Sequence, residues 1–140
     1  MKRIFFLLLL LSSVVFGQVD GPMKYYYASG KLSSEGNFKN GQPDGYWKSY
    51  YENGNVKSEG NRLNGQLDSL WSFYNEKGKK TSDINYRNNI KTGWQYDYFP
   101  TGKVYIQRWM VNGITDSIAH YYHERGYLEK TIFLSGGLEV

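Results

Sequence analysis

The chain has 140 residues, with 17 Lys and Arg against 13 Asp and Glu, a formal net charge of +4 and no cysteine. The lack of cysteine excludes a disulfide-stapled fold, so stability has to come from packing and hydrogen bonding. It also removes the thiol that a bacterial lipid anchor requires, which predicts a protein that is not lipid-anchored.

Residues 1–17 have the features of a cleaved secretory signal peptide. Lys2 and Arg3 precede an apolar stretch that ends at Phe16, and Gly17 suits the cleavage site. The stretch is shorter than the roughly 20 residues that a membrane span needs. We therefore expect export to the periplasm or the extracellular space. Removing the leader lowers the formal charge to +2, which predicts no nucleic-acid binding.

The sequence after the leader repeats with a period of 24 residues and without insertions, and such a period is typical of repeat proteins. One unit contains Tyr50-Tyr51-Glu52-Asn53-Gly54, and each of the remaining units also has a Tyr followed four residues later by a Gly. The tyrosines of this set are Tyr26, Tyr50, Tyr74, Tyr98 and Tyr122. We predict an N-terminal segment over residues 18–25 and a repeat domain over residues 26–140, with four full repeats and one partial repeat.

Each unit contains two turn signals separated by strand-like alternation. The glycines at the end of the Tyr motif mark one turn. The other turn is marked by Asn40-Gly41 and its counterparts, and Asn-Gly favours a tight hairpin. Between the turns, residues such as Leu32, Ser34, Gly36 and Phe38 share one strand face. The sequence therefore predicts an all-β repeat protein, an open antiparallel meander of consecutive β-hairpins.

In such a sheet, equivalent side chains of neighbouring repeats form columns about 9.5 Å apart. We expect the interior to consist of the five tyrosines above and a second column on the same face. That second column is Tyr46, Leu70, Trp94 and Ile118.

The run from Asn40 to Gly54 reads Asn-Gly-x-x-Asp-Gly-x-Trp-x-x-Tyr-Tyr-x-x-Gly, and this pattern resembles the bacterial variant of the MORN (membrane occupation and recognition nexus) repeat. The resemblance extends from about Tyr26 to the C-terminus and weakens after the second unit. It implies a twisted open sheet of hairpins that serves for binding and has no catalytic residues. Some relatives are labelled antitoxin or immunity-like components. Choline-type cell-wall-binding repeats are also aromatic hairpins of similar period and remain an alternative.

The sequence contains no recognisable catalytic, cofactor or metal site. His120, His123 and Glu124 are close in sequence, but an offset of three on a strand places the two imidazoles on opposite faces. Asp44 and its counterparts Asp68 and Asp116 precede Gly or Ser, which is typical of turn residues that bond to backbone.

Five residues are candidates for binding. Trp47 and Trp71 are predicted on the strand face opposite the Tyr column, either as a buried column or as an exposed stacking platform. Tyr105, Trp109 and Phe133 lie where the later strands become apolar on both faces, beside the last strand edge.

We therefore expect an exported, non-enzymatic module that binds another protein, or a second copy of itself, through the C-terminal edge of the sheet. The alternative is a module that binds cell-wall glycan or another carbohydrate through its aromatic side chains. Membrane lipid is a weak candidate, because the charge after leader removal is small and no basic cluster is present.

Overall fold

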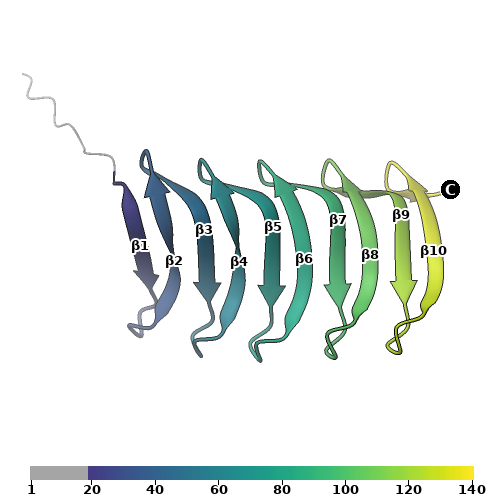
Figure 1. Ribbon diagram of the computed structural model, residues 1–140, viewed down its shortest axis with the longest axis horizontal. Helices are drawn as coiled ribbons and strands as arrows, with labels where there is room; N and C mark the ends of the chain where they lie inside the picture. Colours follow the sequence, from purple (N-terminus) through teal and green to yellow (C-terminus); the bar gives the residue numbers. More distant parts are fainter. Residues whose placement is uncertain (1–18) are drawn as a thin grey trace, which may run out of the picture.

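The computed structural model describes residues 19–140, and these form one sheet of 11 antiparallel strands that follow each other in sequence order (Figure 1). The predicted all-β meander of hairpins is confirmed, whereas the predicted leader lies outside the described residues. Within residues 19–140 there is no helix, and so none that could cross a membrane. The strands are β1 (Gly21–Tyr26), β2 (Leu32–Lys39), β3 (Gln42–Tyr50), β4 (Val56–Leu63), β5 (Gln66–Tyr74), β6 (Lys80–Arg87), β7 (Ile90–Tyr98), β8 (Val104–Val111), β9 (Ile114–Tyr122), β10 (Leu128–Ser135) and β11 (Leu138–Glu139).

The sheet begins five residues before the predicted start of the repeat domain. β1 pairs with β2, for example Lys24 with Glu35, so most of the predicted N-terminal segment 18–25 belongs to the sheet. The first Tyr motif begins at Tyr26, the last residue of β1, and continues into the turn that follows.

Both kinds of turn form where the sequence predicts them. Asn40 and Gly41 have φ angles of 53° and 71°, the pair of positive values that a two-residue type I′ hairpin requires. In the longer turns, Gly54 has a φ of 90° and donates its N–H to the carbonyl of Tyr51 at 2.9 Å. The tight turns lie along one long edge of the sheet and the longer turns lie along the opposite edge (Figure 1).

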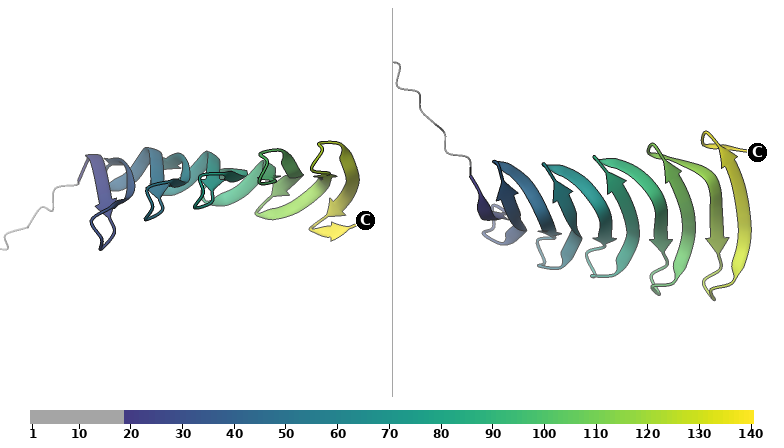
Figure 2. Two further views of the ribbon diagram at one scale, coloured as in Figure 1. Left: turned by 90° about the horizontal axis from the view of Figure 1, so that it is seen from below. Right: turned by 45° about the horizontal axis from the view of Figure 1, so that its top comes forward.

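A bulge interrupts each long strand near its start. Gly60 of β4 pairs with Trp71 of β5, but the next pair is Asn61 with Asp68, so Ser69 and Leu70 have no partner on β4. The first bulged residue has a positive φ in each repeat: Gly45 79°, Ser69 59°, Gly93 67° and Ser117 67°. Such bulges bend the strand that carries them, and the strands of the sheet are visibly bowed (Figure 2).

The buried core lies on the face opposite to the predicted one. Cross-strand partners share a face, and the pairs place eight residues in one row that crosses the sheet. This central row is Trp47, Gly60, Trp71, Ile84, Gln95, Arg108, Ala119 and Ile132. Trp47 and Trp71 are only 7% and 4% exposed, and Ala119 is also buried.

The prediction that the Tyr column forms the interior is therefore wrong. Tyr26 is 59% exposed and the other tyrosines of that column are half-buried, while Tyr46 and Leu70 of the second predicted column are 51% and 48% exposed. The sheet is a single curved layer, so the face on which side chains converge becomes the core and the other face remains open to solvent. We attribute the choice of face to the bend at the bulges.

Candidate binding surface

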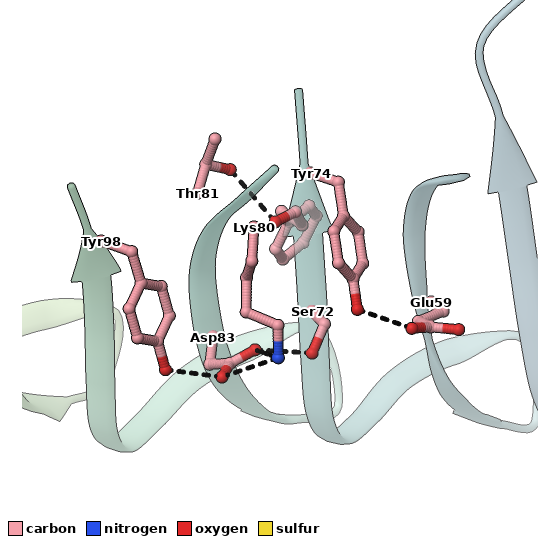
Figure 3. A network of polar contacts seen from close by, with 8 residues as sticks. Glu59, Ser72, Tyr74, Lys80, Thr81, Asp83 and Tyr98 are labelled. Carbon is pink, nitrogen blue, oxygen red and sulfur yellow. Dashed lines mark hydrogen bonds and ion pairs between the residues drawn. The ribbon is translucent and has the colours of Figure 1, made fainter. Parts of the chain in front are cut away.

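The Tyr column stands on the open face, where its hydroxyls form a regular set of hydrogen bonds. Tyr50 donates to Oε1 of Glu35 at 2.6 Å, and Tyr74 donates to Oε1 of Glu59 at 2.7 Å. Tyr98 donates to Oδ2 of Asp83 at 2.7 Å. The acceptor always lies 15 residues before the tyrosine, so each bond ties one repeat to the previous one (Figure 3).

These bonds shift the pKa of both partners. The hydrogen bond from Tyr74 lowers the pKa of Glu59 below its ordinary 4.5, because it stabilises the carboxylate. Burial, helped by the same bond to Glu59, raises the pKa of Tyr74 to about 12. Tyr50 and Glu35 are affected in the same way. At neutral pH each pair is a neutral phenol on a charged carboxylate.

Lysines balance the carboxylates in the first three repeats. Lys24 lies 3.5 Å from Glu35, Lys48 lies 3.3 Å from Glu59, and these residues are direct cross-strand partners. Asp83 is paired with Lys80 at 3.0 Å. In the fourth repeat the equivalent acceptor is the neutral Gln107, which receives the hydroxyl of Tyr122 at 3.1 Å. The open face therefore loses its charge toward the C-terminal repeats.

In the same C-terminal repeats, the open face gains large apolar side chains on four neighbouring strands, β7 to β10. We call this set, Trp94, Trp109, Ile118 and Phe133, the apolar row. Trp94 is the cross-strand partner of Trp109, and Ile118 is the partner of Phe133. The rings of Trp94 and Trp109 meet edge to face at 5.3 Å, and His120 stacks on Trp94 at 6.4 Å. Trp109 is 36% exposed and Phe133 is 58% exposed.

Of the five predicted binding residues, Trp109 and Phe133 belong to the apolar row, on β8 and β10. Tyr105 is exposed on β8, but its ring lies against Phe99 at 4.9 Å and Tyr121 at 6.5 Å. The sequence predicts Trp94 in the interior and no binding role for His120. The contacts of Trp94 with Trp109 and His120 follow from the strand register, which the bulges set.

Trp47 and Trp71 form the buried column and not the exposed platform. Their indole N–H groups donate to the carbonyls of Asn37 at 3.1 Å and Asn61 at 2.8 Å. The guanidinium of Arg62 lies 5.9 Å and 5.4 Å from the two rings. These contacts hold both indoles inside the curved sheet, where they stabilise the fold.

The other polar candidates have structural partners. Asp44 accepts the N–H of Asn64 at 3.2 Å, and Asp116 accepts the N–H of Gly136 at 3.0 Å, so each acid supports a turn of the neighbouring hairpin. The Nδ1 atom of His120 is 3.0 Å from Oγ1 of Thr131, and Nδ1 of His123 accepts the N–H of Arg125 at 3.0 Å. Across residues 19–140, no three His, Cys, Asp or Glu side chains are grouped as a metal site would require.

Comparison with known proteins places the repeats in a family. The profile of the MORN repeat variant matches residues 19–40 and 43–64, which contain β1 to β4. No curated protein matches the chain. A solved structure, the Glycosylation Associate Protein (Gap123) complex from Streptococcus agalactiae, is similar with a TM-score of 0.48 and 16% identity, over 79% of this chain and 21% of that chain. The two matched units are MORN repeats of the variant type, and the units that follow them share the same strand pattern.

Proposed function

We propose that this MORN-repeat protein is an exported, non-enzymatic module that binds another protein through its apolar row. The observation that carries the proposal is the set of large apolar side chains on the open face, with Phe133 58% exposed on β10 and Trp109 36% exposed on β8. A contiguous exposed apolar patch on a soluble domain is typical of a protein-binding surface. Aromatic side chains are enriched at the centre of such interfaces.

The distribution of charge supports the same surface. Next to the apolar row, the positions that hold Glu35 and Glu59 in the first repeats are occupied by the neutral Gln107 and Thr131. Removing charge around an apolar patch lowers the cost of desolvation when a partner covers it. We infer no catalytic role for Glu35, Glu59 and Asp83, because each accepts a hydrogen bond from a tyrosine hydroxyl. An antitoxin-like role would be one form of such binding and would need its own toxin as the partner.

The test compares partner capture by two variants with matched chemistry. The double variant Ile118→Ser, Phe133→Ser removes the C-terminal half of the apolar row. The control, Tyr46→Ser, changes an exposed ring in the first part of the sheet, at the repeat position equivalent to Ile118. The proteins are incubated with the cell envelope of the source organism, and bound proteins are quantified by mass spectrometry.

We expect a partner that is retained by the wild type and by Tyr46→Ser and is lost by the double variant. Circular dichroism confirms that all three proteins keep the same fold. If folded wild type and double variant retain the same proteins in the same amounts, the apolar row is not the binding surface.

A further inference from the structure

A cavity of about 480 Å³ opens between β5, β6, β7 and β8, beside the apolar row. Its walls include Asp68, Asn85, Arg87 and Thr92, together with the indole of Trp109. The volume falls in the range of about 300 to 1,000 Å³ that is common for small-molecule sites. Tyr86 also lines the cavity, and two aromatic residues among several polar side chains are the composition expected of a site for a polar ligand.

The cavity lies where two bulges meet. Ser69 and Gly93 have φ angles of 59° and 67°, and both border the cavity. Bulges of this kind re-aim the side chains around them and leave backbone groups out of the ladder. The concavity therefore arises from a feature that recurs in the repeats, but its lining is particular to this place.

Asp68 differs from its counterparts in a way that favours a ligand. Asp44 and Asp116 use their carboxylates to hold the N–H of Asn64 and Gly136 in the next turn. The carboxylate of Asp68 instead receives the hydroxyl of its neighbour Ser69 at 2.7 Å. Its remaining acceptor capacity faces the cavity rather than a turn.

The charges of the lining cancel. Asp68 and Arg87 supply one negative and one positive group, and neither takes part in the ion pairs found within residues 19–140. The other lining side chains are neutral. A ligand with a net charge would therefore find one attractive and one repulsive group, whereas a neutral ligand with many hydroxyls could donate to Asp68 and accept from Arg87.

Trp109 supplies the apolar part of the site. Its ring meets Trp94 edge to face at an interplanar angle of 81°, so the indole is held in place while it remains 36% exposed. A pyranose ring has a face of C–H groups that covers an indole and a rim of hydroxyls that bond to planar polar groups. Both halves of that chemistry are present in this cavity.

We propose that this cavity binds one or two rings of a neutral saccharide, with Trp109 under the sugar and Asp68 and Arg87 at its hydroxyls. This site is separate from the buried Trp47 and Trp71, and it goes beyond the protein-binding role of the apolar row. The larger cavity of about 610 Å³ near Asn75 and Glu76 is less suited, because Oδ1 of Asn75 already accepts two backbone N–H groups and the carbonyl of Glu76 accepts two side-chain amides.

The first test is fluorine NMR of the protein labelled with 5-fluorotryptophan. The protein contains four tryptophans, so four signals are expected. The probes are cellobiose, N,N′-diacetylchitobiose and maltose, with inorganic phosphate and putrescine as charged controls. We expect at least one disaccharide to shift the signal that is missing in Trp109→Phe, while the signals of the buried Trp47 and Trp71 stay in place. The proposal is overturned if no disaccharide moves that signal, or if only a charged control does.

The second test uses variants outside the apolar row, so that failure here is distinct from failure of protein binding. Arg87→Ala and Asp68→Asn should each weaken disaccharide binding by about tenfold or more, as loss of a charged hydrogen-bonding partner does. Their matched controls are Lys39→Ala and Asp44→Asn, at the same repeat positions but outside the cavity. Equal affinities in the folded site variants and the controls would overturn the proposal.

Discussion

Gly60 and Trp71 face each other across β4 and β5 so closely that a Cβ on residue 60 would lie 2.5 Å from two atoms of the indole. Gly36 has the same relationship to Trp47, with distances down to 2.3 Å. Real Cβ atoms do not approach other atoms so closely, so only glycine permits the ring to lie flat on the neighbouring strand. Glu59 and Gly60 are neighbours in sequence and act on opposite faces: the Glu accepts the hydroxyl of a tyrosine on the open face, and the Gly makes room for a tryptophan in the core.

The first prediction concerns the coupling of this pair. Trp71→Ala should lower the free energy of unfolding by about 3 to 5 kcal/mol, because it leaves a cavity in the core. Gly60→Ala should lower it by about 1 to 3 kcal/mol, because the added methyl collides with the ring. In the Trp71→Ala background, Gly60→Ala should cost almost nothing. Urea unfolding of the four proteins measures the coupling, and additive effects would contradict the close contact.

The second prediction follows from how the later repeats fill the same position. Ile84 and Gln95 replace the Gly and Trp, and Arg108 and Ala119 follow. In each case a residue larger than Gly at the first position faces a residue smaller than Trp at the second position. Gln95→Trp alone should destabilise the protein by about 1 to 3 kcal/mol through overpacking against Ile84.

Adding Ile84→Gly to Gln95→Trp rebuilds the pair of the earlier repeats and should recover most of that loss. Thermal unfolding of the single and double variants tests this. A double variant that is less stable than both single variants would show that the backbone of the third repeat does not allow the ring to lie on residue 84.

The architecture could be predicted from the sequence because it depends on local rules. Asn40-Gly41 and Gly54 fix the two turns, and an unbroken period of 24 residues repeats them. The choice of the buried face could not, because both faces carry aromatic residues at alternate positions. That choice depends on the curvature that the bulges produce. The first bulged residue is Gly at 45 and 93 but Ser at 69 and 117, so the bulge has no constant residue in the sequence. Gly36 and Gly60 were the usable signal, since small residues opposite a tryptophan indicate close packing.

Only part of the candidate surface could be predicted from the sequence. The apolar composition of the later strands indicated Trp109 and Phe133, and both are exposed. The contact between Trp94 and Trp109 depends on cross-strand register. Register past a bulge cannot be counted along one strand, so Trp94 was assigned to the interior.

The third prediction tests the tyrosine bonds of the open face. Tyr74→Phe removes only the hydroxyl that donates to Glu59 at 2.7 Å, and it should lower the free energy of unfolding by about 1 kcal/mol. Tyr26→Phe is the matched control at the same repeat position, and because that ring is 59% exposed the change should have almost no effect. Urea unfolding compares the two. Equal effects of the two substitutions would mean that the bond to Glu59 contributes nothing to stability.

The last prediction is the acid limit of stability. Hydrogen bonds from Tyr50 and Tyr74 hold the pKa of Glu35 and Glu59 below the ordinary 4.5. Each group therefore binds a proton more readily in the unfolded chain than in the folded one. The stability that it supplies is complete above pH 4.5, and it is lost as the pH falls toward the lowered pKa of the folded state.

Stability measured by urea unfolding should thus be level near neutral pH and should decline as the pH falls below the ordinary glutamate value. Glu59→Gln should be less stable than the wild type at neutral pH, because the carboxylate that Tyr74 and Lys48 contact is gone. It should also lose less stability on acidification, so that the two curves converge at low pH. Parallel curves would show that the pKa of Glu59 is the same in the folded and unfolded protein.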